Sequence, residues 1–371
     1  MPKIPSHLLN AACVIALAFT SAVSLADSFT QTNLVSDIPG MAANTDPNLK
    51  NPWGISNSAT SPFWLSDQAT NLSTLYNGAG VPQALVVSIP VSPTPPNGPT
   101  GTVFNSSTGF VVGANPSNFI FANLNGTISA WNGSAGTTAQ VEVPSSGAVY
   151  TGLAQASNAS GTFLYAANSA PGGSINVFNS TWHATTLSGN FTDTLLPPGL
   201  VPFNVQNING NLYVTYASLG PGGTPMPGGV VDEFDANGNF IKRIATAGDL
   251  FAPWGITLAP ASFGAFSNDI LIGNFGNGEI LAYDATTDAF LGTLDNSSGN
   301  PIVNDHLWAL ETRNAPGFDP NAVYFSAGIN NQADGLFGAI TEVPEPTTII
   351  ETGLGLFALA AAKFRRFIPG R

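Results

Sequence analysis

Short hydrophobic segments, separated by turns rich in Gly, Pro and Asn, follow one another along most of the chain. One of them, Trp53-Gly54-Ile55, returns as Trp254-Gly255-Ile256 and more loosely as Trp308-Ala309-Leu310. We identify three weaker copies, which are Thr108-Gly109-Phe110, Thr151-Gly152-Leu153 and Phe203-Asn204-Val205. The middle residues of the six copies are 55, 43, 52, 51 and 54 positions apart. A repeat near fifty residues is typical of one blade of a β-propeller.

The segments that follow each copy are also rich in strand-forming residues. The first group is Phe63 to Asp67, Phe119 to Asn123, Phe163 to Asn168, Leu212 to Tyr216, Ile270 to Asn274 and Val323 to Ala327. The second group is Ser73 to Asn77, Thr127 to Trp131, Ser174 to Phe178, Val230 to Phe234, Glu279 to Tyr283 and Leu336 to Ile340. A further apolar run follows several of these: Ala84 to Ile89, Gln140 to Val143 and Phe240 to Ile244. The pattern predicts an all-β fold with six blades of four antiparallel strands, over residues 27–342.

The composition agrees with this fold and narrows the function. The 371 residues include 40 Gly and 29 Pro, and only 8% are charged. The net charge of -13 argues against a nucleic-acid partner, because binding to phosphates needs clustered Lys and Arg. Cations or neutral glycans are more compatible partners.

The N-terminus has the features of a secretory signal peptide over residues 1–26. Lys3 precedes the apolar run from Ala11 to Phe19, and Ser24-Leu25-Ala26 provides small residues for signal peptidase. A membrane anchor is the alternative, although the run is shorter than the ~20 residues that a span needs. We therefore expect export through the Sec translocon. Cys13 is the only cysteine, so the mature domain has no disulfide.

The segment Phe29 to Val35 reads as a lone strand, whereas the sixth blade ends after three strands near Glu342. Pairing these two segments would remove two exposed sheet edges. We predict that the N-terminal strand closes the last blade. The alternative is a disordered leader.

Four loops are longer than the others and are predicted to share one face of the propeller: Val91 to Thr100, Ser169 to Gly173, Leu219 to Gly229 and Gly328 to Gly335. Four polar residues end strands at that face: Asp67, Asn123, Asn168 and Asn274. They are candidate ligands of a channel cation such as Ca²⁺, since hard cations prefer oxygen ligands. The alternative is turn formation, in which Asn and Asp side chains accept hydrogen bonds from the local backbone.

The aromatic residues Trp53, Trp254 and Trp308 allow two interpretations. They could form a platform for sugars, or they could pack between blades next to the small residues at the axis. Packing is the interpretation that we favour.

The chain contains none of the catalytic motifs Gly-x-Ser-x-Gly, His-Glu-x-x-His or the Walker loop, and the Asp305-His306 pair is weak evidence for a base.

Strings such as Phe63-Trp64-Leu65-Ser66-Asp67 and Ile272-Gly273-Asn274-Phe275 resemble those of NHL-type and lactonase-type six-bladed propellers, over about residues 28–342. The lactonase resemblance implies a divalent cation held at the central channel by acidic and Asn ligands. Asp67, Asn123, Asn168 and Asn274 are the partial counterparts in this chain. No Glu is expected at a matching strand position.

The C-terminus resembles the PEP-CTERM sorting signal of bacterial exported proteins, which an exosortase recognises. Val343-Pro344-Glu345-Pro346 is the motif, Thr347 to Ala362 is the apolar part, and Lys363, Arg365 and Arg366 form the basic tail. The resemblance implies a transmembrane helix within residues 343–371, an intermediate in the inner membrane and then release at the cell surface or outside the cell. The alternative is a permanent C-terminal membrane anchor. The whole chain thus resembles an uncharacterised propeller family that carries this signal.

Two functions of different classes are compatible with these features. The first is an exported, surface- or matrix-associated propeller that acts as a binding or scaffold protein, with extracellular polysaccharide as one partner. The second is a metal-dependent hydrolase of the lactonase type. The fold itself does not distinguish them.

Overall fold

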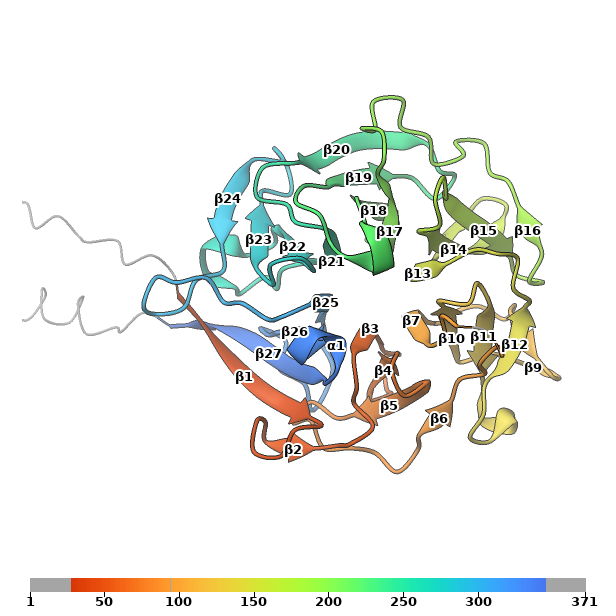
Figure 1. Cartoon of the computed structure of the whole chain (residues 1–371), viewed down its shortest axis with the longest axis horizontal. Helices are drawn as coiled ribbons and strands as arrows, with labels where there is room; N and C mark the ends of the chain where they lie inside the picture. Colours follow the sequence, from red (N-terminus) through yellow and green to blue (C-terminus); the bar gives the residue numbers. More distant parts are fainter. Residues whose placement is uncertain (1–27, 94, 345–371) are drawn as a thin grey trace, which may run out of the picture.

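A computed structural model describes residues 28–93 and 95–344. Most of the strands belong to six antiparallel blades that are arranged as a ring around one axis, and the chain passes once around the ring (Figure 1). In five blades the first strand in the chain lies next to the axis, and in the remaining blade β25 (Leu307–Thr312) does. The predicted six-bladed propeller is thereby confirmed.

The blades are numbered in chain order, each from its inner strand outwards. Blade 1 contains β3 (Pro52–Ser56), β4 (Phe63–Asp67), β5 (Leu72–Tyr76) and β6 (Val87–Ser88). Blade 2 contains β7 (Pro99–Phe104), β10 (Phe119–Asn123), β11 (Ile128–Trp131) and β12 (Gln140–Val143). Blade 3 contains β13 (Tyr150–Asn158), β14 (Gly161–Asn168), β15 (Ile175–Asn179) and β16 (Ala184–Thr185).

The second half of the ring repeats this order. Blade 4 contains β17 (Val201–Ile208), β18 (Asn211–Ala217), β19 (Val230–Phe234) and β20 (Phe240–Thr246). Blade 5 contains β21 (Pro253–Leu258), β22 (Ile270–Asn274), β23 (Ile280–Tyr283) and β24 (Phe290–Thr293). Blade 6 contains β25 (Leu307–Thr312), β26 (Val323–Ala327), β27 (Leu336–Val343) and β1 (Ser28–Ser36).

The remaining elements of the described residues are short. They are β2 (Asn44–Thr45), β8 (Val111–Val112), β9 (Asn115–Pro116), η1 (Gly133–Ala135), η2 (Pro221–Gly223), η3 (Gly264–Phe266) and α1 (Ile329–Gln332).

The inner strand of blade 2 differs from the sequence prediction. The sequence pattern predicts Gly109 as its small residue, but Gly109 precedes the added hairpin of β8 and β9, and the inner strand is β7 with Gly101. The corrected small residues are Gly54, Gly101, Gly152, Asn204, Gly255 and Ala309, which are 47, 51, 52, 51 and 54 positions apart. The true repeat is therefore more regular than the predicted one.

Crowding between neighbouring inner strands explains the small residues. A Cβ atom on Gly54 would lie 2.6 Å from the backbone oxygen of Thr100, and one on Gly101 would lie 2.3 Å from the backbone nitrogen of Leu153. The pairing register also shifts beside the small residue in all six blades. Such bulges bend a strand and redirect its side chains, here at the axis.

The hydrophobic core is divided among the interfaces between blades. Ile120 and Leu164, for example, are fully buried in one cluster between blades 2 and 3. Leu271 and Phe325 belong to another cluster between blades 5 and 6. Each blade is therefore stabilised mainly by its two neighbours, so the ring depends on closure between its first and last blades.

The N-terminal strand makes this closure, as predicted. β1 pairs antiparallel with β27, from Ser28 opposite Val343 to Ser36 opposite Leu336. Lys50, which precedes blade 1, forms ion pairs with Asp37 and with Asp334 after α1. The closed ring therefore joins residues from both ends of the domain.

The predicted export and sorting segments lie largely outside the described residues. This applies to the signal peptide of residues 1–26 and to Glu345, Pro346 and the rest of the C-terminal tail, with its predicted hydrophobic helix. Val343 ends β27 and Pro344 follows it. Within residues 28–93 and 95–344, no helix is long and apolar enough to cross a membrane.

Candidate binding sites at the two ends of the axis

All six inner strands run in the same direction along the axis. We call the end at which they begin the upper end and the end at which they finish the lower end. Residues such as Pro52 and Pro253 pair with the ends of the second strands, at Asp67 and Asn274. The predicted face of long loops is therefore the upper end.

A cluster of five aromatic rings lies near the upper end of the axis. Trp53 and Trp308 stack with ring centroids 3.5 Å apart, and Trp254 meets both at nearly right angles. Phe275 stacks on Trp308 at 4.2 Å, and Phe203 meets Phe275 edge to face. None of the three tryptophans is more than 6% exposed. The favoured packing interpretation of these residues thus agrees with their burial and contacts.

Hydrogen bonds hold the aromatic cluster to several blades. The indole N–H of Trp254 donates to the backbone oxygen of Thr151 at 3.0 Å, and that of Trp308 donates to the Asn51 side chain at 2.9 Å. The Asn204 amide donates to the backbone oxygen of Trp254 at 2.8 Å. These bonds hold the five aromatic rings in place across the axis, and we call this cluster the aromatic plug.

Above the plug lies a pocket of about 450 Å³. Its lining residues are uncharged and come from all parts of the ring: Trp53, Gln68, Pro96, Leu124, Val149, Thr151, Ser169, Phe203, Leu219, Gly222, Gly223, Phe275, Trp308 and Gln332. The floor is aromatic, and amide and hydroxyl groups stand around it. We call this the upper pocket.

The four long loops each contribute to the upper pocket. Pro96, Ser169, Leu219 and Gln332 come from the four different loops. Gln68 and Gln332 both accept hydrogen bonds from the Asn51 amide, at 2.8 and 3.2 Å. The prediction that the four long loops share one face of the propeller therefore agrees with the structure.

Asp67 and Asn123, two of the predicted channel residues, are fully buried at the ends of their strands. The backbone N–H of Thr74 donates to Asp67, and the Asn123 amide donates to Thr127 and Ser129 within blade 2. Burial raises the pKa of the Asp67 carboxyl well above its usual range. One carboxylate oxygen of Asp67 and the amide oxygen of Asn123 have no hydrogen-bond partner among the described residues.

The other two candidates also bond to nearby backbone. The Asn168 side-chain oxygen accepts from the N–H groups of Val149 and Ala170, and the Asn274 side chain bonds to Phe251 and Asp249. None of the four candidates lines the upper pocket. The residues that immediately follow them, Gln68, Leu124, Ser169 and Phe275, do so instead.

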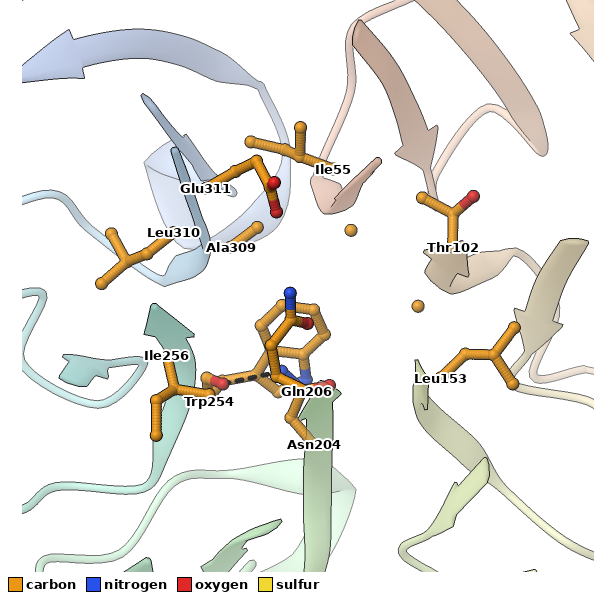
Figure 2. Close-up of a pocket in the computed structure, with 12 residues that line it drawn as sticks. Ile55, Thr102, Leu153, Asn204, Gln206, Trp254, Ile256, Ala309, Leu310 and Glu311 are labelled. Atoms are coloured by element: carbon orange, nitrogen blue, oxygen red, sulfur yellow. Dashed lines mark hydrogen bonds between the residues drawn. The ribbon is translucent and has the colours of Figure 1, made fainter. Parts of the chain in front are cut away.

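Below the plug, the axis contains a cavity of about 10 Å³, which is room for one water molecule. Figure 2 shows the side chains of Glu311 and Gln206 directed towards this space, with Ile55 and Leu153 on other sides. The cavity continues into a mouth of about 310 Å³ that shares Ile55, Thr102, Leu153, Gln206 and Glu311 with it. We call the cavity and its mouth the lower pocket.

Glu311 is the only charged side chain that lines either pocket in the described part of the chain. It lies on inner strand β25, two residues after Ala309, and one carboxylate oxygen accepts from the Asn57 amide at 3.3 Å. Burial raises the pKa of this carboxyl to about 8, against the opposing effects of Asn57 and the positive charge of Arg313. Glu311 corrects the expectation that no Glu stands on the strands at the channel.

The groups considered for catalysis are not combined in either pocket. His306 lies 2.7 Å from Asp305 and packs on Phe275, but it lines neither pocket. Residues 28–93 and 95–344 contain no group of three or more His, Cys, Asp or Glu side chains placed to hold a metal ion.

The fold and these pockets define a six-bladed β-propeller with an uncharged pocket on its upper face. No family model matches the chain. It is 30% identical to the uncharacterized protein R648 of Acanthamoeba polyphaga mimivirus, over 83% of this chain and 78% of that protein. The chain therefore belongs to the same family as R648. Uncharacterized protein L690 of the same virus is 28% identical, over 83% and 84% of the two chains.

Comparison with solved structures supports the fold alone. A structural genomics protein of unknown function from Bacteroides thetaiotaomicron aligns with a TM-score of 0.53 at 12% identity, over 85% of this chain and 76% of that chain. The PQQ-bound aldose sugar dehydrogenase from Streptomyces coelicolor aligns with a TM-score of 0.51 at 12% identity, over 86% and 99%. At this identity, neither neighbour assigns an activity to the chain.

Proposed function

We propose that the protein is a non-catalytic binding propeller that takes an uncharged, hydroxyl-rich ligand, such as the end of a neutral glycan, in its upper pocket. The observation that carries this proposal is the lining of the pocket. Fourteen residues line it, and none is charged. An aromatic floor with amide groups at the rim suits a ligand that has both an apolar face and hydroxyl groups.

The rim amides could bind such a ligand without a large rearrangement. Gln332 is the last residue of α1, within the Gly328 to Gly335 loop, and the Asn51 amide donates to its side-chain oxygen. Its amide N–H groups therefore point away from Asn51 and can donate to a hydroxyl group. The rigid blades below keep the loops in position, as is common for binding sites on scaffolds of this kind.

A fluorescence titration tests the proposal, because Trp53 and Trp308 lie on the pocket floor. We expect neutral oligosaccharides such as cellobiose or maltose to change the emission of the full chain, and charged polygalacturonate to have no effect. Gln332→Ala should weaken binding about tenfold, the effect of one or two lost hydrogen bonds. Gln83→Ala is the matched control, since Gln83 is an exposed amide of blade 1 outside the pocket. Equal binding by both variants, or no response to any neutral sugar, would overturn the proposal.

The hydrolase alternative requires titratable or metal-binding groups at the substrate. The sequence candidates for that role bond to groups near their own strands and line neither pocket, and Glu311 lies at the other end of the axis from the upper pocket. The binding role is accordingly the one that we favour.

We also propose that the chain is exported and sorted, on the strength of residues 1–26 and 343–371 alone. Replacing Pro344-Glu345-Pro346 by three alanines tests the sorting step. We expect this variant to accumulate at full length in the membrane fraction, whereas the original chain is processed. Identical fractionation of both, with the C-terminus retained, would contradict sorting.

A further inference from the structure

We propose that the lower pocket is a second binding site, which takes the protonated amino group of a primary alkylamine on Glu311. This site lies at the opposite end of the axis from the glycan pocket and is independent of it. The inference rests on the shape of the lower pocket, on its single charge and on the unused bonding capacity of two side chains.

The shape of the lower pocket matches an ammonium group on an alkyl chain. Its inner part has room for one water molecule, which is close to the size of an –NH₃⁺ group. The mouth, of about 310 Å³, is lined mainly by polar groups, and Ile55, Val103 and Leu153 form apolar stretches of its walls. An alkyl chain can pack along these walls while the ammonium group reaches the inner cavity.

Two polar side chains can accept hydrogen bonds from that ammonium group. Asn57 occupies only one of the two Glu311 carboxylate oxygens. The Gln206 amide is directed into the same space and has no hydrogen-bond partner among the residues that the structure describes (Figure 2). Because nothing fixes the orientation of this amide, its oxygen can turn towards a donor. The third N–H of the ligand faces the mouth, where water can accept it.

The charge around Glu311 favours a cation. Arg313, which directly follows the end of β25, is the charged group whose field acts on Glu311, and it lines neither pocket. Its guanidinium stacks 3.6 Å from the Phe318 ring centroid and donates to the backbone oxygens of Ser58 and Ser61. The side chains that neighbouring inner strands present to Glu311 in the lower pocket are uncharged. A cation from outside can therefore supply the missing partner charge.

An organic cation fits better than a bare metal ion. Calcium takes six to eight oxygen ligands, often from several carboxylates. Glu311 is the only carboxylate of the lower pocket, and the described residues contain no metal-binding group of three acidic or His side chains. One carboxylate and one amide oxygen are sufficient for two of the three N–H groups of an ammonium ion.

The test is a calorimetric titration of the full chain with butylammonium chloride from pH 6 to pH 9. The amine stays protonated over this range, since alkylamines have pKa values near ~10.5. Glu311 must ionise to bind it, so affinity should rise roughly tenfold per pH unit up to about pH 8 and then level off. In addition, binding at pH 7 should release close to one proton, measured by comparing buffers of different ionisation enthalpy.

Three comparisons decide the outcome. Glu311→Gln should lower the affinity at least tenfold and abolish proton release, whereas Glu142→Gln, on outer strand β12, should bind as the original chain does. 1-Butanol, which has the same chain without the charge, should not bind. Gln206→Leu should lower the affinity while retaining proton release, and this readout remains informative if Glu311→Gln folds poorly.

Several results would overturn the proposal. They are unchanged binding by Glu311→Gln, affinity that falls or stays constant as the pH rises, or equal binding of 1-butanol. If calcium chloride bound to the original chain and butylammonium did not, the pocket would be assigned to a metal ion instead.

Discussion

The two ends of the propeller axis use the same six inner strands to build opposite kinds of pocket. The upper pocket is formed where the strands begin, receives residues from four long loops and has no charged lining. The lower pocket is formed where the strands end, draws its walls mainly from strand residues and contains one carboxyl. The comparison indicates that in this fold the loops determine the shape of one end, whereas single strand positions determine the chemistry of the other.

The aromatic plug is what keeps the two pockets distinct. Trp53 and Trp308 line only the upper pocket, whereas Trp254 lines only the lower one. The three indoles contact one another across the axis. A ligand at one end is therefore separated from the other end by one layer of buried rings.

The largest expected effect comes from removing the centre of this plug. Trp308→Ala should lower the free energy of unfolding by about 4 kcal/mol, because it leaves a cavity under four aromatic neighbours. It should also weaken binding in the upper pocket. Urea denaturation measures the first effect and sugar titration the second. Trp308→Phe, which keeps a ring in place, should lose less than half as much stability. A loss below about 1 kcal/mol for Trp308→Ala would mean that the plug does not support the ring.

The second prediction concerns the carboxyl of the lower pocket. The folded-state pKa of Glu311 is raised to about 8, above a typical unfolded value of ~4.3. The folded protein therefore binds more protons in this window, so the free energy of unfolding falls as the pH rises from about 4 to 8 and then levels off. After allowance for the partial exposure of the side chain, the fall is on the order of 2 kcal/mol.

The change from Glu311 to Gln removes this titration. Melting curves from pH 5 to pH 9 should give a stability difference between Glu311→Gln and the original chain that grows in favour of the variant up to about pH 8. The upper pocket should bind its ligand equally well in both proteins. Parallel pH profiles would show that Glu311 is solvated and ionised, and the contrast between the two ends would then disappear.

The ring of blades could be predicted well from the sequence because the patterns that indicate each strand are local in the chain. The repeat, the strand pattern and the closure by the N-terminal strand follow from hydrophobic periodicity and from the need to pair sheet edges. The error at blade 2 arose because Gly109-Phe110 imitates the inner-strand motif, while Thr100-Gly101-Thr102 lacks a large apolar neighbour. Phe110 is fully buried for another reason, since it packs on Trp182 beside the β8–β9 hairpin.

The sites were harder to predict because they depend on which way a side chain points. Asp67 and Gln68 are adjacent, yet one is buried in blade 1 and the other lines the upper pocket. Glu311 could have been found by comparing the position two residues after each small residue at the axis. The residues there are Ser56, Val103, Ala154, Gln206, Thr257 and Glu311, and only the last is charged. That comparison requires the correct alignment of blade 2, which the sequence alone did not provide.

The smallest expected effect tests whether the loops of the upper end can be loosened without loosening the rest of the ring. Lys50 forms ion pairs with Asp37 and Asp334, and the Asp37 hydrogen bond raises the pKa of its amine. These pairs hold the Gly328 to Gly335 loop, which carries Gln332 to the upper pocket. Lys50→Met should therefore lower the free energy of unfolding by about 1 kcal/mol and weaken sugar binding a few fold, with both effects reduced in 1 M salt.

Lys242→Met provides the matched comparison for Lys50→Met. Lys242 forms ion pairs with Asp288 and Glu233 between blades 4 and 5, away from both pockets. Its loss should cost a similar amount of stability, because both lysines join two carboxylates near the surface. Binding at either end should stay unchanged, since no pocket residue is held by that pair. If both variants weakened sugar binding equally, the effect would come from general loosening of the ring. The upper pocket would then not depend on the Gly328 to Gly335 loop, and the comparison of the two ends would fail.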